Sequence, residues 1–66
     1  MPRPTIITTI RQPSGQTLVL YRHQQAYKVG VLSSHQRPIP LQDSTFGTYE
    51  AAHTRLMQEA QQRRQL

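Results

Sequence analysis

Apolar and β-branched residues are concentrated in three stretches of the first half of the chain. Residues 5–10 are almost entirely β-branched, and such side chains favour a pleated sheet because they lose rotamer freedom in a helix. Residues 17–22 and 26–33 repeat this chemistry, and the apolar residues at alternate positions of 27–31 share one face. The pattern predicts three β-strands.

Turn-forming residues separate these predicted strands. In the Pro-Ser-Gly segment at 13–15 the proline presets φ and the glycine accepts a positive φ. The His-Gln-Gln segment at 23–25 separates the second strand from the third. Three strands at hairpin spacing predict an antiparallel meander over residues 5–33. Gly30 weakens the interior of the third strand, so we expect a bend or a crossing helix beside it.

Prolines shape the two other segments of the first 47 residues. Residues 1–4 alternate proline with other residues and are expected to form a flexible, extended leader. Residues 34–44 turn to Pro, Gln, Ser and Asp, and residues 34–47 are predicted to form the main loop. The prolines of this segment exclude a central strand, although Ile39 and Leu41 allow a short fourth strand at the edge of the sheet.

The C-terminal part of the chain has the pattern of an amphipathic helix over residues 48–64. Thr48 is a favourable N-cap, and the carboxylate at position 50 opposes the positive end of the helix dipole. Arginines at 63 and 64 complement the dipole in the last turn. An apolar face steps by three or four residues through Tyr49, Ala52, Leu56 and Ala60. This face is expected to be buried.

We therefore expect one small α+β domain over residues 1–66. A three-stranded antiparallel meander, with room for a short fourth edge strand, packs on one C-terminal helix. Ala52 and Ala60 allow the helix to lie close to the sheet near Gly30, and Leu56 is the expected central contact. A core this small leaves little net stability, because apolar burial and chain entropy nearly cancel.

Composition narrows the class of protein. The chain has no cysteine, which excludes disulfides and removes the commonest ligands of structural zinc. The longest apolar run, residues 18–21, is far too short to cross a bilayer, and the N-terminus lacks a charged-then-apolar leader. We expect a cytoplasmic protein with no membrane partner.

The chain has few residues that could form a catalytic or metal site. The chain has three acids and three histidines: Asp43, Glu50, Glu59, His23, His35 and His53. Helix electrostatics explain the two glutamates and a turn explains the aspartate. The histidines are twelve and eighteen residues apart, which matches no compact zinc motif, and the chain has no glycine-rich phosphate loop. We expect no enzymatic activity, no cofactor and no bound metal.

Charge gives the strongest indication of a partner. Eight basic residues against three acidic ones give a formal net charge of +5, which indicates either an anionic partner or a solubilising coat. The basic residues on or beside the strands are Arg11, Arg22 and Lys28, and Arg37 lies in the predicted main loop. A sheet that carries the helix on its other face can present several of them together to a nucleic acid.

Two tyrosines lie beside these basic residues. Tyr21 and Tyr27 flank the turn at 23–25. They either stack on bases next to Arg22 and Lys28 or pack as cross-strand aromatics in or around the core. The six residues Arg11, Arg22, Lys28, Arg37, Tyr21 and Tyr27 make up the candidate nucleic-acid surface.

The period of two along the strands complicates this surface. Arg22 has the parity of Leu18 and Leu20, whereas Arg11 has that of Ile7. Either a bulge shifts the register or both faces of the sheet are partly apolar. The second case favours a dimer that buries the face opposite the helix.

The helix opens with Thr-Phe-Gly-Thr-Tyr-Glu-Ala-Ala at 45–52. With the strands and polar loop before it, over residues 18–60, this order resembles the N-terminal arm-binding domains of tyrosine recombinases and the related plant-type three-stranded DNA-binding domains. It also resembles the helix start of small uncharacterised bacterial domains. The resemblance implies a three-stranded sheet that enters the major groove with a helix packed behind it. The strands here are less basic than in those DNA readers, and the chain contains no recombinase catalytic domain.

Two functions remain open at this point. One is a small accessory protein of a bacterial, plasmid or phage genome that binds DNA or RNA through the sheet face. The other is a protein-interaction or homodimeric module, which meets a protein partner through an exposed β edge or the second sheet face.

Overall fold

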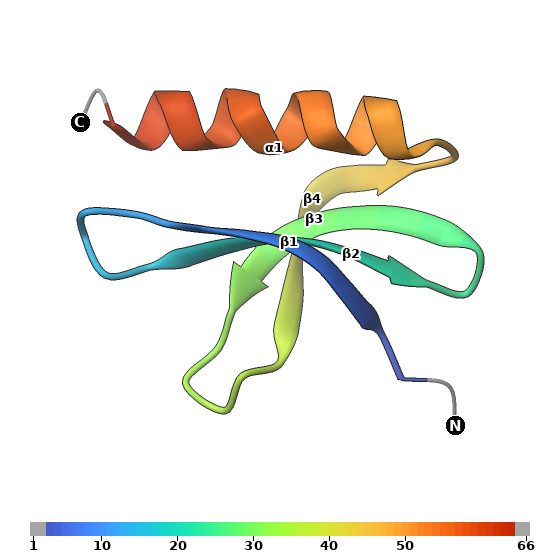
Figure 1. The fold of residues 1–66 in the computed structure, drawn as a ribbon, viewed down its shortest axis with the longest axis horizontal. Coiled ribbons are helices and arrows are strands. Elements are labelled where there is room, and N and C mark those ends of the chain that lie inside the picture. The colour runs from blue at the N-terminus through green and yellow to red at the C-terminus, as the bar shows by residue number, and fades with distance from the viewer. Residues whose placement is uncertain (1–2, 65–66) are drawn as a thin grey trace.

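Four antiparallel strands and one helix follow each other along the chain in the computed structural model, which describes residues 3–64 (Figure 1). They are β1 (Thr5–Arg11), β2 (Thr17–His23), β3 (Ala26–Leu32), β4 (Pro38–Phe46) and α1 (Tyr49–Arg64). The strands pair in chain order. The predicted α+β class, the meander and the fourth edge strand are therefore confirmed. Of the predicted leader, Arg3 and Pro4 have no regular secondary structure, and residues 1–2 lie outside the described part.

The prediction of a loop over residues 34–47 is wrong for most of its length. β4 occupies nine of these residues, and the connection before it shrinks to residues 33–37. Pro38 pairs with Leu32 and Pro40 with Gly30. Proline is tolerated here because an edge strand needs only one of its two sides for ladder hydrogen bonds.

A large bulge divides β4 into two halves. Lys28 pairs with Thr45 and Gly30 with Pro40, so residues 41–44 stand opposite a single residue of β3. Asp43 has a φ of 54° within the bulge, and the buried Ser44 hydroxyl donates a hydrogen bond to the Leu41 carbonyl. Figure 1 shows the result: the second half of β4 runs beneath α1, while the first half turns away from the helix.

Two of the three hairpin connections have the same geometry. Residue 12 bonds to residue 16 through N–H···O at 2.7 Å, and the Gly15 N–H donates to the residue 12 carbonyl. The connection at 33–37 repeats both bonds, and Gln36 takes the place of Gly15. The φ values agree, at 94° for Gly15 and 63° for Gln36. The turn predicted at 13–15 is confirmed, and its glycine lies in the left-handed region. A glutamine in this region has a steric cost that glycine does not have.

The core lies between the sheet and the helix, as predicted. Leu18, Leu20 and Val29 of the sheet meet three residues of α1, and the central one, Leu56, is fully buried. The helix crosses β2, β3 and β4. Thr48 caps its N-terminus, since its Oγ1 accepts a hydrogen bond from the Ala51 N–H at 3.3 Å.

Gly30 is required for a reason other than the helix crossing suggested by the sequence. A Cβ placed on Gly30 would lie 2.1 Å from the Ile39 carbonyl oxygen. The missing side chain therefore makes room for the backbone of β4, where the strand approaches β3 next to its bulge.

Replacing Leu56 by alanine should lower the free energy of unfolding by about 2 to 5 kcal/mol, because the substitution leaves a cavity in the only core between sheet and helix. Urea titration followed by circular dichroism measures this loss. Met57, whose exposed fraction is 49 %, provides the control: Met57→Ala should cost much less. Equal losses for the two variants would contradict the described packing.

Gly30→Ala should destabilise the protein by about 1 to 3 kcal/mol, because the new methyl group collides with the β4 backbone. Gly47→Ala is the matched control, since a Cβ at Gly47 meets no atom within 4 Å. It should change the free energy of unfolding by about 0.5 kcal/mol or less. A Gly30→Ala variant as stable as the wild type would show that β4 does not approach β3 in this way.

Candidate nucleic-acid interface

We call the side of the sheet away from α1 the open face. Strand alternation places Thr17, Val19 and Tyr21 on it, since Leu18 and Leu20 face the helix. Val19 and Tyr21 are nevertheless 0 % and 4 % exposed. Prolines from the N-terminal segment and from β4 close over this region.

A pocket of about 260 Å³ marks the closure at one end of the open face. Its walls are Pro4, Tyr21, His23, Lys28, Pro38 and Pro40. The first half of β4 thus covers Tyr21 by turning away from the helix at its bulge. Both alternatives left open by the strand parity occur together: register shifts interrupt β1 and β4, and both faces of the sheet are partly apolar.

The structure separates the predicted surface residues into two groups. Arg11 and Lys28 lie on the open face, because they pair with Thr17 and Tyr21. Arg22 and Tyr27 pair with each other on the helix face, where the Arg22 guanidinium lies over the Tyr27 ring at 5.9 Å from its centre. The six predicted residues therefore do not form one surface.

Neither tyrosine offers a free ring for stacking on a base. Tyr27 packs against the core and meets Tyr49 edge to face, with ring centres 6.1 Å apart. Tyr21 forms part of the floor of the open face, and its burial raises the pKa of its phenol above the usual value of 10. Tyr21 is thus neutral at physiological pH. Of the two roles considered from the sequence, packing in or around the core therefore fits both tyrosines better than stacking on bases.

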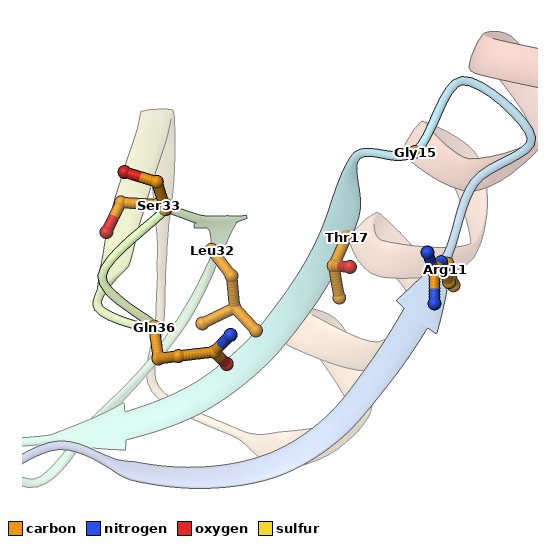
Figure 2. Close-up of a pocket in the computed structure, with 7 residues that line it drawn as sticks. Arg11, Gly15, Thr17, Leu32, Ser33 and Gln36 are labelled. Carbon is orange, nitrogen blue, oxygen red and sulfur yellow. The ribbon is translucent and has the colours of Figure 1, made fainter.

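A second and larger pocket of about 400 Å³ lies at the other end of the open face, between the two hairpin loops of equal geometry (Figure 2). Arg11, Gly15 and Thr17 line it from one hairpin, and Leu32, Ser33, Ser34 and Gln36 line it from the other. In Figure 2 the Gln36 side chain extends toward Leu32 and β2. Arg37 follows in the same loop, and its side chain is exposed.

Sequence reasoning placed Arg11 in a binding surface but missed the hydroxyl and amide groups around it. Thr17 and Leu32 were taken only as strand residues, although Thr17 pairs with Arg11 and both line the pocket with it. The turn-forming residues of the two loops were the signal that could have indicated this pocket. Residues 33–37 bring the loop back opposite the glycine turn at 13–15, and this juxtaposition becomes visible only once the fourth strand is recognised.

Arg55 and Arg63 of the helix are engaged with an acid. Glu59 accepts from Arg55 Nε at 2.9 Å and from Arg63 Nη1 at 2.7 Å. Arg55 also donates to the carbonyls of Gln42 and Asp43 at 3.5 and 3.4 Å, so it holds the bulge of β4 against the helix. Within residues 3–63, these two arginines form all the ion pairs of the structure.

Charge is consequently segregated along the fold. Residues 1–37 contain five basic residues and no acid, whereas residues 38–66 contain three of each. The whole excess of +5 therefore belongs to the N-terminal segment, the first three strands and the loop after them, and α1 with β4 is formally neutral.

One buried polar side chain lies next to Arg11. Gln12 is 4 % exposed, and neither Oε1 nor Nε2 has a hydrogen-bond partner among the described residues. An unpaired buried amide costs about 1 to 3 kcal/mol.

The histidines do not assemble into a site. His23 lines the smaller pocket, His35 is exposed in a turn, and His53 stacks on Tyr49 with ring centres 5.7 Å apart. Over the described part of the chain, no three His, Asp or Glu side chains gather as a metal site would require. Nor does α1 have the length and apolar character to span a membrane.

Comparisons with protein-family models, curated proteins and solved structures yielded no match for this chain. The resemblance to arm-binding domains of tyrosine recombinases thus stays a prediction. The fold departs from that pattern in one respect: a fourth strand, β4, follows the meander in the chain before the helix and forms an edge of the sheet.

Proposed function

We propose that this protein is a non-enzymatic, cytoplasmic module that binds nucleic acid through the open face of its sheet. The segregation of charge carries the proposal. The first 37 residues hold the whole excess of five basic residues. Two of them, Arg11 and Lys28, lie on the open face, and Arg22 lies on the helix face. A solubilising coat gives no reason for such a separation, whereas a phosphate backbone favours it.

Positions on the open face support the same proposal. Arg11 lies at one pocket and Lys28 at the other, with Arg37 exposed in the loop beside the larger pocket. A nucleic-acid backbone that follows the open face passes all three. Because Tyr21 and Tyr27 are packed into the protein, the binding energy comes from phosphate contacts and not from base stacking.

Binding that neutralises about three to five phosphates should weaken with salt, with log affinity falling against log salt at a slope of about −3 to −4.5. Fluorescence anisotropy with labelled single-stranded and duplex oligonucleotides measures this slope. Lys28→Gln should weaken binding and reduce the slope by about 0.9, because one phosphate contact is lost.

Arg63→Gln is the control for this experiment, since it removes one positive charge from a side chain already paired with Glu59. It should leave the slope unchanged. The proposal fails if affinity for both oligonucleotides is independent of salt, or if Arg63→Gln weakens binding as much as Lys28→Gln does.

A second candidate function, self-association through β1, rests on a difference between the two edges of the sheet. The β4 edge is interrupted by two prolines and a four-residue bulge that Arg55 covers. β1 has only a one-residue bulge at Ile7. Natural sheets protect their edges with prolines, bulges or charges, and β1 carries no charge before Arg11.

Apolar groups surround this open edge. Ile6 and Ile7 are 44 % and 41 % exposed, and Met57 of α1 is 49 % exposed beside a pocket that it lines with Ile10. We infer that the occupant is a second copy of this chain, paired antiparallel through β1. The uncharged strand lets two copies meet without like-charge repulsion, and a small core gains from the added burial.

Sedimentation equilibrium should then give a mass approaching twice the chain's 7.6 kDa as concentration rises. Ile7→Lys should shift the protein to monomer, because it puts charge into the paired edge. Ile39→Lys, which changes an isoleucine of similar exposure on β4, should leave association unchanged. A wild type that stays monomeric at every concentration excludes this second function.

A further inference from the structure

We propose that the pocket between the two hairpin loops binds a single nucleotide unit through its phosphate and sugar. If the nucleotide is part of a single-stranded nucleic acid, this proposal rests on the function proposed above. If it is a free mononucleotide, the proposal depends on the pocket alone. Two observations on the pocket carry the proposal: its lining chemistry and its size.

The lining suits a phosphate ester. Arg11 supplies a guanidinium with five N–H donors, the group that best matches phosphate oxygens. Thr17 adds a hydroxyl group that can donate to the same oxygens or to a sugar. Leu32 gives one apolar wall, so the pocket has both the charge for a phosphate and a surface for the rest of a nucleotide.

The size of the pocket selects one nucleotide over a duplex. Its volume of about 400 Å³ lies within the range of about 300 to 1,000 Å³ that is typical of small-molecule sites. It opens between two loops at the end of the sheet (Figure 2), where a single unstacked unit can enter. A base pair held in a double helix presents only its phosphates to such an opening.

Position 36 brings an amide to the pocket. Gln36 takes the place that Gly15 has in the other loop, with a φ of 63°. Gln24, Gln25 and Asp43 also have a positive φ, so it is the side chain of Gln36 and not its backbone that matters here. Gln36 extends its amide into the pocket, as Figure 2 shows, and this amide can donate to phosphate or to a base edge.

The experiment follows backbone amide shifts of ¹⁵N-labelled protein during titration with adenosine 5′-monophosphate, with adenosine, and with a short single-stranded oligonucleotide. We expect the monophosphate and the oligonucleotide to shift the amides of Gly15, Ser33, Ser34 and Gln36. Adenosine should shift them far less, because it lacks the phosphate.

Gln36→Gly tests the side chain without endangering the fold. It removes the amide and relieves the positive φ, so the melting temperature should be equal or higher. Affinity for the monophosphate should nevertheless fall about tenfold, as for a lost hydrogen bond to a charged group. Gln25→Gly makes the same change at another positive φ, in the β2–β3 turn outside the pocket, and should leave affinity unchanged.

The outcomes separate this inference from the proposed function. Oligonucleotide binding that shifts only residues around Lys28 and is unaffected by Gln36→Gly overturns the nucleotide pocket and leaves the function standing. Monophosphate binding without oligonucleotide binding supports the pocket and removes the function. Equal shifts from adenosine and its monophosphate, or no shift from either ligand, overturn the pocket.

Discussion

Four residues of β4 stand opposite the single residue Val29 of β3, and the bend that this mismatch creates shapes both sides of the sheet. After the bend, β4 runs beneath α1 and helps to enclose the core. Before it, the strand brings Pro38 and Pro40 over the open face. Arg55 fixes this arrangement, because its guanidinium reaches both the carbonyls of the bulge and the Glu59 carboxylate.

The same contacts determine where charge is available. Glu59 engages Arg55 and Arg63, so the described positive groups of the helix already serve the fold. The basic residues of the first 37 positions have no acidic neighbours in sequence. Among them, Arg11 and Lys28 lie on the open face, whereas Arg22 lies on the helix face. The nucleic-acid binding that we propose therefore depends on Arg11 and Lys28 more than on Arg22.

The two hairpin loops at 12–16 and 33–37 have the same backbone hydrogen bonds but different residues at the position with a positive φ. At 13–15 the chain uses the glycine that the left-handed position favours, and at 36 it uses a glutamine. The hydrogen-bond pattern is the same in both, so the backbone alone does not require the glutamine. The difference lies in the side chain that reaches the pocket, which is why this position has greater weight in the proposed binding site than the exposed cations around it.

Local chemistry in the sequence was sufficient for the first three strands, the turn at 13–15, the helix and its Thr48 cap, because each depends on residues close together in the chain. Tertiary structure decided the rest. The prolines were expected to allow only a short edge strand, yet β4 spans nine residues because an edge strand pairs on one side only. Period-two counting along single strands could not tell which basic residues share a face with Lys28, because the cross-strand pairs Arg11–Thr17 and Tyr21–Lys28 decide it. The pocket at Arg11 depends on two loops about twenty residues apart, and only the pairing of all four strands brings them together.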